Sequence, residues 1–193
     1  MNATSSLGLA AGAAFATELL ILFFLLRFMS RHRVTAPNYR GIEIPIAIGV
    51  SFPATLFVVF MVERILGVYP GGEAGVYLAA VTGISLLGFI DDLIGTRDTL
   101  GFRGHIRKLF HGELTTGGLK AVGGGIIAVY ASALLFKSWQ DILVNALVMA
   151  LFANLINLLD LRPGRAIKGF LVLFVILFFA AKSDLFLFLP LLA

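Results

Sequence analysis

Six long runs of apolar residues alternate with short polar segments along this chain. A helix that crosses a membrane needs about 20 mostly apolar residues, and each run comes close to that length. The pattern therefore predicts six spanning helices, followed by an apolar segment that is too short to cross alone. The predicted spans are approximately residues 7–29, 44–62, 75–95, 119–136, 141–160 and 167–182, and the short segment is 185–193.

The composition supports this assignment. Of the 193 residues, 59% are hydrophobic and 13% are charged, whereas soluble domains are about half apolar and about one quarter charged. We expect an all-α polytopic membrane protein of about six transmembrane helices in one domain, residues 1–193. The first run is longer than a signal-peptide core and follows no basic segment, which indicates a retained span. The chain has no Cys, which excludes disulfides and thiolate metal sites.

Positive residues are concentrated in alternate loops. Of the 15 Lys and Arg residues, only Arg64, Lys137 and Lys182 do not lie in or beside the segments that follow the first, third and fifth spans. Because Lys and Arg favour the cytoplasmic side, we expect a cell (plasma) membrane protein with its N-terminus outside. The expected cytoplasmic loops are about residues 30–43, 96–118 and 161–166.

Two adjacent carboxylates, Asp91 and Asp92, end the third predicted span in GFIDDLIG (88–95). They repel each other, and the macrodipole disfavours negative charge at a helix C-terminus. A divalent cation or a nearby Arg or Lys would offset both effects. Mg²⁺ suits such oxygen ligands and commonly bridges carboxylates and a substrate phosphate. The simpler interpretation is a solvated helix end that pairs with Arg97 or Arg103.

A polar stripe ends the fifth predicted span. In ANLINLLD (153–160), Asn154, Asn157 and Asp160 recur every three residues, so they share one side of a helix. Buried Asn side chains often form hydrogen bonds between spans, which is one interpretation. The other is the wall of a site that ends in a carboxylate on the same membrane face as Asp91 and Asp92.

Basic and glycine-rich segments on that face could hold phosphate. In the segment 95–125, cations and glycines alternate; Arg binds phosphate oxygens bidentately, and glycines let backbone N–H groups approach closely. Attraction to anionic lipid headgroups is the alternative. In LDLRPGRAIKGF (159–170), Arg162, Arg165 and Lys168 could form an anion cradle.

Glu18 lies near the middle of the first predicted span. A mid-span acid is costly and usually has a partner or handles protons. We therefore keep both a helix contact and a role in ion-coupled transport as hypotheses for this residue.

Four stretches, in this order, resemble the polyprenyl-phosphate hexosamine-1-phosphate transferase family, which includes the phospho-N-acetylmuramoyl-pentapeptide transferase of cell-wall synthesis. The resemblance implies that a prenyl phosphate attacks the β-phosphate of a UDP-sugar, giving a prenyl-diphosphate sugar and UMP. It also implies Mg²⁺, or Mn²⁺ in its place, as cofactor. The stretches are PNYRGIEIPIAIG (37–49), GFIDDLIG (88–95), RGHIRKLF (103–110) and NLINLLD (154–160).

The resemblance implies catalytic roles for Asp91, Asp92 and Asp160, with Asp92 and Asp160 as metal ligands. The expected partners are a polyprenyl phosphate such as undecaprenyl phosphate, a UDP-sugar and the membrane, with no nucleic acid. The residue pattern and the resemblance together give these substrate- or phosphate-binding candidates: Asn38, Arg103, His105, Lys108, Lys120, Asn154, Asn157, Arg162 and Arg165.

The chain also departs from the family pattern. It has fewer spans than family enzymes, and Leu161-Arg162-Pro163-Gly164 follows the polar stripe where the family has G-x-D-G. The family's later acidic and His-rich motifs have no counterpart. Two alternatives therefore remain: a catalytically inactive relative that binds prenyl phosphate or a partner enzyme, and an ion-coupled transporter or structural membrane protein. A homodimer in which two chains complete one site is a variant of the transferase hypothesis.

Overall fold

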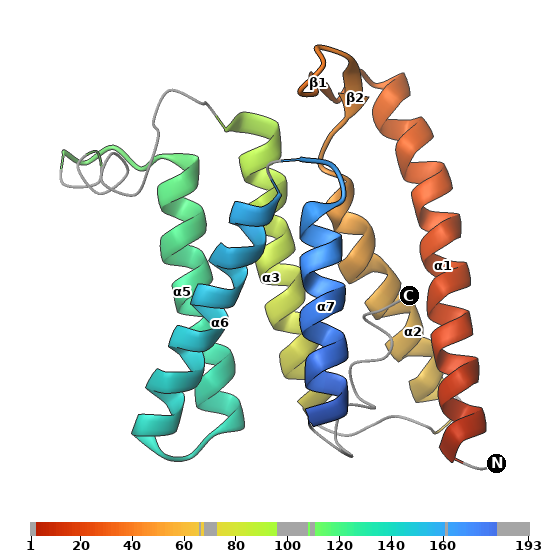
Figure 1. Ribbon diagram of the computed structural model, residues 1–193, viewed down its shortest axis with the longest axis vertical. Helices are drawn as coiled ribbons and strands as arrows, with labels where there is room; N and C mark the ends of the chain where they lie inside the picture. The colour runs from red at the N-terminus through yellow and green to blue at the C-terminus, as the bar shows by residue number, and fades with distance from the viewer. Residues whose placement is uncertain are drawn as a thin grey trace.

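A computed structural model describes residues 3–65, 67, 73–95, 108, 111–160 and 162–180. The described part confirms the all-α prediction (Figure 1). A short antiparallel hairpin and one 3₁₀ turn join the first two helices. The helices are α1 (Ala3–Arg31), α2 (Ser51–Ile65), α3 (Glu73–Ile94), α5 (Thr116–Leu135), α6 (Trp139–Leu159) and α7 (Arg165–Ala180); the other elements are β1 (Thr35–Pro37), β2 (Glu43–Pro45) and η1 (Ile48–Val50).

Five helices are long and apolar enough to cross a membrane, namely α1, α2 with the η1 turn before it, α3, α5 and α6. This agrees with the predicted membrane character. The sixth predicted span, 167–182, coincides largely with α7, which has 16 residues in the described part of the chain. The number of spans and their orientation stay predictions.

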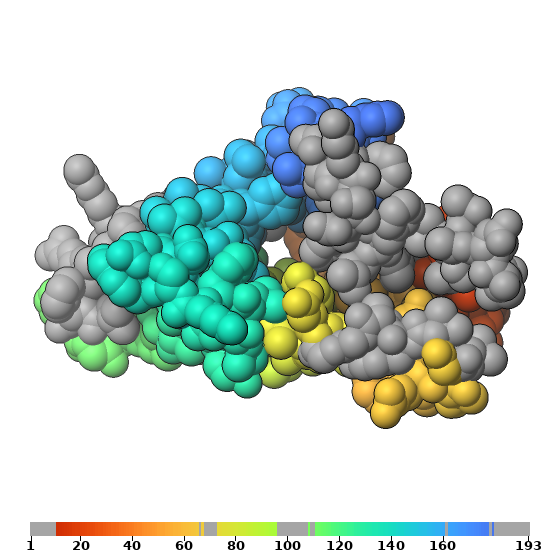
Figure 2. Space-filling model, turned by 90° about the horizontal axis from the view of Figure 1, so that it is seen from below, coloured from red at the N-terminus to blue at the C-terminus, as the bar shows by residue number. Residues whose placement is uncertain are grey.

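Consecutive helices pack as antiparallel neighbours. Each helix packs against the one before it, most extensively α5 against α3 and α6 against α5. As a result, the C-terminal ends of α1, α3 and α6 and the N-terminal ends of α2, α5 and α7 gather at one end of the bundle, together with the hairpin (Figure 1). Figure 2 views the opposite end, which the α5–α6 turn, the start of α3 and the end of α2 form.

Small residues allow α3 and α5 to approach closely. A Cβ atom on Gly83 would lie 2.8 Å from Ile127 Cδ1, and one on Gly123 would lie 2.8 Å from Leu87 Cδ1. Many large apolar side chains, such as Phe57, are instead exposed on the outer surface. Small residues at helix contacts and large apolar residues outside are the arrangement expected for helices surrounded by lipid.

One polar contact joins α1 and α2 in the interior. Glu18 is 6% exposed and Thr55 is 4% exposed, and the Thr55 hydroxyl donates a hydrogen bond of 2.5 Å to the Glu18 carboxylate. This contact gives the mid-span acid a partner on the neighbouring helix.

The second span begins later than the sequence predicted. The predicted span 44–62 starts within β2, and the α2 helix begins only at Ser51. Pro45 lacks the N–H that a helix interior needs, and Ala47 adopts a left-handed conformation with φ 61°, so the chain turns before the helix begins. The predicted cytoplasmic turn therefore contains a paired hairpin, with Thr35 opposite Pro45 and Pro37 opposite Glu43.

Candidate functional site

Lys120 connects three helices at the end of the bundle that carries the hairpin. Its ammonium Nζ donates a hydrogen bond of 2.9 Å to Asn157 Oδ1 of α6 and lies 3.5 Å from Asp91 Oδ2 of α3. The Lys120 and Asp91 side chains are 35% and 31% exposed, so both side chains remain accessible to solvent and to a ligand. Three residues that the sequence nominated separately are thus neighbours.

Local structure explains why each partner is there. Asp91 lies in the last turn of α3, where the helix dipole disfavours a carboxylate, and the Lys120 ammonium offsets that effect. Thr115 caps α5 by accepting a hydrogen bond from the Gly118 N–H, which starts the helix so that Lys120 falls in its second turn. Gly95 ends α3 with an N–H bond to the Asp91 carbonyl oxygen, and a Cβ atom at this position would collide with that oxygen.

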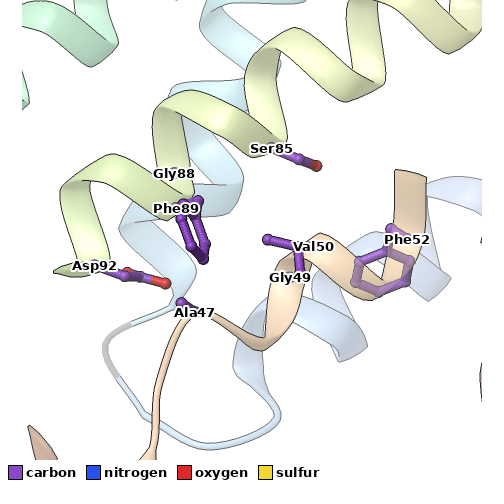
Figure 3. A pocket seen from close by; sticks show the side chains of 8 residues that line it. All are labelled: Ala47, Gly49, Val50, Phe52, Ser85, Gly88, Phe89 and Asp92. Carbon is purple, nitrogen blue, oxygen red and sulfur yellow. The ribbon is translucent and has the colours of Figure 1, made fainter. Parts of the chain in front are cut away.

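Asp92 points toward the segment before α2 (Figure 3). The backbone N–H of Ala47 faces the Asp92 carboxylate and favours its charged form. Between α3 and this segment lies a cavity of about 180 Å³, lined mainly by small and apolar residues, with Asp92 at one end and Ser85 farther along α3 (Figure 3). The left-handed turn at Ala47 therefore delivers a backbone donor to the second carboxylate.

Asp160 completes the charged group. It forms the C-cap of α6, where its N–H donates to the carbonyl oxygens of Ile156 and Asn157. Its charge acts on Asp92, as do the charges of Asp91 and Lys120. Three carboxylates and one ammonium therefore influence one another at this end of the bundle, and we call these four residues the charged cluster.

The charge balance of the cluster favours an additional cation. The Asp92 carboxylate is repelled by Asp91 and Asp160, and it is attracted by the Lys120 ammonium and the Ala47 N–H. Within the described ranges, however, no three His, Cys, Asp or Glu side chains are close enough to hold a metal ion by themselves. The residues fit Mg²⁺ only if a bound phosphate and water supply further oxygens, which is common for this ion.

The other nominated residues lie around the cluster or away from it. Asn154 is exposed one turn before Asn157, and Arg162 and Arg165 are exposed at the α6–α7 turn, where Gly164 has φ 77°. The Lys108 ammonium lies 3.9 Å from the Glu113 carboxylate, so in the described part of the chain it pairs with Glu113 and not with the cluster. Arg103 and His105 lie outside the described residues.

Asn38 occupies the tip of the hairpin. Its side-chain oxygen accepts hydrogen bonds from the backbone N–H groups of Arg40 and Ile42, at 2.8 and 3.1 Å. The Asn38 side-chain oxygen therefore stabilises the turn, and the substrate-binding role of Asn38 stays a prediction.

Sequence reasoning missed two features of the site. Nothing in the sequence marks Ala47 as the donor to Asp92, because a non-glycine residue with positive φ is uncommon and has no sequence signature. The role of Lys120 as a bridge between helices was also missed. The signal that could have found it is its position one turn before a Gly run, because small residues mark the side of a helix that packs against a neighbour.

Comparisons of this chain with protein-family models, with curated proteins and with solved structures found no match.

Proposed function

We propose that this protein is a membrane transferase that moves a sugar-1-phosphate from a UDP-sugar to a polyprenyl phosphate in cell-envelope glycan synthesis. The observation that carries the proposal is the meeting of Asp91, Lys120 and Asn157 from three helices. Phosphoryl transfer depends mainly on positioning and on neutralising charge, and a partly exposed cluster of fixed cation, carboxylates and amide supports both tasks. The ordered motifs that resemble the family give the substrate class.

In the proposed reaction, an oxygen of the prenyl phosphate attacks the β-phosphorus of the UDP-sugar and forms a new P–O bond. The bond from that phosphorus to the bridging oxygen breaks, and UMP leaves with the electron pair. Lys120 would lie against phosphate oxygens, held in position by Asn157 and Asp91. Arg162 and Arg165 at the α6–α7 turn would hold the anionic nucleotide.

Mg²⁺, or Mn²⁺ in its place, is part of the proposal: held by Asp92, Asp160 and phosphate oxygens, it would neutralise the negative charge that the reaction concentrates on the phosphates. The proposed location is the plasma membrane, with the charged cluster on the cytoplasmic side, where UDP-sugars are available. A homodimer that completes the open site is compatible with this proposal.

The test is lipid-linked product formation by the purified full chain in proteoliposomes that contain undecaprenyl phosphate, with Mg²⁺ and a panel of labelled UDP-sugars. We expect organic-extractable label together with released UMP. Lys120→Met and Asp91→Asn should each reduce the rate by about 100-fold, the effect of removing one charge-stabilising group. Lys137→Met and Asp141→Asn, at the opposite end of the bundle, are the matched controls and should keep the rate. Absence of product from every UDP-sugar with folded protein would refute the proposal.

A second candidate function is binding of a prenyl phosphate without turnover. Two observations favour it: Lys120 already neutralises Asp91, and the described residues offer no group of three metal-binding side chains. A protein of this kind would bind the prenyl phosphate equally well with and without Mg²⁺, and would release no UMP. Binding that depends strongly on Mg²⁺ would instead favour the transferase.

An ion-coupled transporter is the third candidate, based on Glu18. The hydrogen bond from Thr55 gives this acid a structural partner, which favours a helix contact over a transport role. Proton or ion flux in proteoliposomes that disappears in the Glu18→Gln variant would support the transporter hypothesis.

A further inference from the structure

The hairpin between α1 and α2 has one apolar face and one mixed face. The register pairs Ala36 with Ile44 and Pro37 with Glu43. Because side chains alternate along a strand, Ile44 and its partner Ala36 share one face and Glu43 lies on the other; Ile42 directly precedes β2. Ile42 and Ile44 are 56% and 43% exposed, so the rest of the described chain leaves this apolar face largely uncovered.

The tip of the hairpin is rigid and carries an aromatic and a cation. The Asn38 side chain caps the turn, and Gly41 takes the left-handed conformation, with φ 74°. Tyr39 is 63% exposed, and the Arg40 guanidinium lies 5.2 Å from the centre of its ring. An aromatic ring beside a cation is the combination that favours the boundary between acyl chains and headgroups.

The length of α1 would place the hairpin near that boundary. At 1.5 Å per residue, the 29 residues of α1 extend about 43 Å, which matches a bilayer of about 40–45 Å with its headgroups. The hairpin follows the end of α1 directly and lies at the same end of the bundle (Figure 1). The exposed cations Arg31 and Arg33 precede the hairpin in the chain and Arg40 lies at its tip, and such cations attract anionic lipid headgroups.

We propose that this hairpin, residues 35–45, is a membrane-surface anchor. Its apolar face, Ile42 and Ile44, enters the headgroup layer of the membrane that the helices cross, and its arginines bind anionic phospholipid. The anchor fixes the strand that leads into Ala47, and hence the backbone donor to Asp92. This role does not depend on the proposed transferase activity.

The experiment uses single cysteines, because the chain has none of its own. Ile42→Cys and Glu43→Cys, at neighbouring positions where β2 begins, are each nitroxide-labelled in the full chain in liposomes of phosphatidylcholine with phosphatidylglycerol. Spin relaxation by oxygen, which concentrates in lipid, is compared with relaxation by a water-soluble nickel complex. We expect the nickel complex to relax the label at residue 43 several-fold more strongly than the label at residue 42, and oxygen to show the opposite order.

Two further measurements make the outcome decisive. Combining Arg33→Gln and Arg40→Gln should increase nickel access to the residue 42 label in anionic liposomes, with little change in liposomes of phosphatidylcholine alone. Ile44→Cys should reproduce the behaviour of Ile42→Cys, which guards against a local disturbance by one label. Equal nickel access at residues 42, 43 and 44 in anionic liposomes would overturn the proposal. So would protection that arises only when another protein is added, since the face would then bind a protein partner.

Discussion

Lys120 explains, at the scale of single residues, how this chain accommodates two adjacent carboxylates at a helix end. Asp91 and Asp92 leave the same turn: Asp91 lies 3.5 Å from the Lys120 ammonium, and Asp92 faces the Ala47 N–H. Each carboxylate thus has its own partner on a different element. The sequence predicted that a divalent cation or a nearby Arg or Lys would offset these charges; Arg97 and Arg103, named in the simpler interpretation, lie outside the described residues.

Thr55→Val tests the buried contact between α1 and α2. The change keeps the side-chain volume but removes the only hydroxyl that donates to Glu18 in the described part of the chain. We expect the free energy of unfolding to fall by about 0.5–2 kcal/mol. This is the range measured for losing one hydrogen bond between spans or leaving one buried polar group without a partner. Unfolding in mixed detergent micelles, followed by circular dichroism, measures it.

Thr82→Val is the matched control for that experiment, because Thr82 is an exposed residue of α3. Its effect should be within about 0.5 kcal/mol, as for most surface substitutions. Equal losses in the two variants would show that the Thr55 hydroxyl contributes nothing specific.

The contact between α3 and α5 decides, at the scale of elements, whether the charged cluster can form. Asp91 ends one helix and Lys120 begins the other, so their distance depends on how closely the two axes approach. Gly83 and Gly123 allow that approach, because Ile127 and Leu87 occupy the space where their Cβ atoms would be.

Gly123→Ile should therefore separate α3 from α5, and Gly124→Ile should not, because no atom lies within 4 Å of a Cβ at Gly124. Overpacking costs about 1–3 kcal/mol, which corresponds to a melting temperature about 2–12 °C lower for a chain of this size. Thermal unfolding of the two variants in the same detergent measures the difference in melting temperature. The change in helix propensity from Gly to Ile is the same in both variants, so it does not contribute to this difference. Similar melting temperatures would show that this contact tolerates a wider spacing.

The elements differed in how well the sequence predicted them. Helix positions followed from the length of apolar runs, and each predicted span overlaps a helix. The start of α2 did not follow, because apolar residues continue through Ile44, Ile46 and Ile48 while the backbone turns at Ala47. Hydrophobicity reports burial in lipid or protein and does not report backbone conformation, so the hairpin was also not predicted.

The whole molecule is a row of antiparallel neighbours, and this connectivity gathers the functional candidates. Alternating helix direction brings the polar ends of α3, α5, α6 and α7 to one end (Figure 1). The gathering at one face was predictable from the alternation of basic loops. The specific contact of Lys120 with both Asp91 and Asn157 was not predictable. It requires α5 to pack against both α3 and α6, and sequence periodicity does not determine which helices become neighbours.

Cysteine labelling tests the orientation of this arrangement. We expect a membrane-impermeant maleimide, added to intact cells, to label Gln140→Cys at the start of α6 and to leave Glu113→Cys before α5 unlabelled. The physical reason is that the basic loops favour the cytoplasm. Labelling of both variants after detergent solubilisation is the control for reactivity. The reverse pattern, or equal labelling in intact cells, would contradict the predicted topology.

During synthesis, Glu18 reaches the translocon well before Thr55, its partner 37 residues later in the chain. A charged residue at the centre of an isolated helix opposes insertion by about 2.5–3.5 kcal/mol. We therefore expect a nascent chain that stops at Val50 to insert α1 less completely than the same chain with Glu18→Leu, as glycosylation mapping would measure, and the difference to shrink once Ile65 has been added. The first span would then be secured by the arrival of the second, and the two would enter the bilayer as a helical pair.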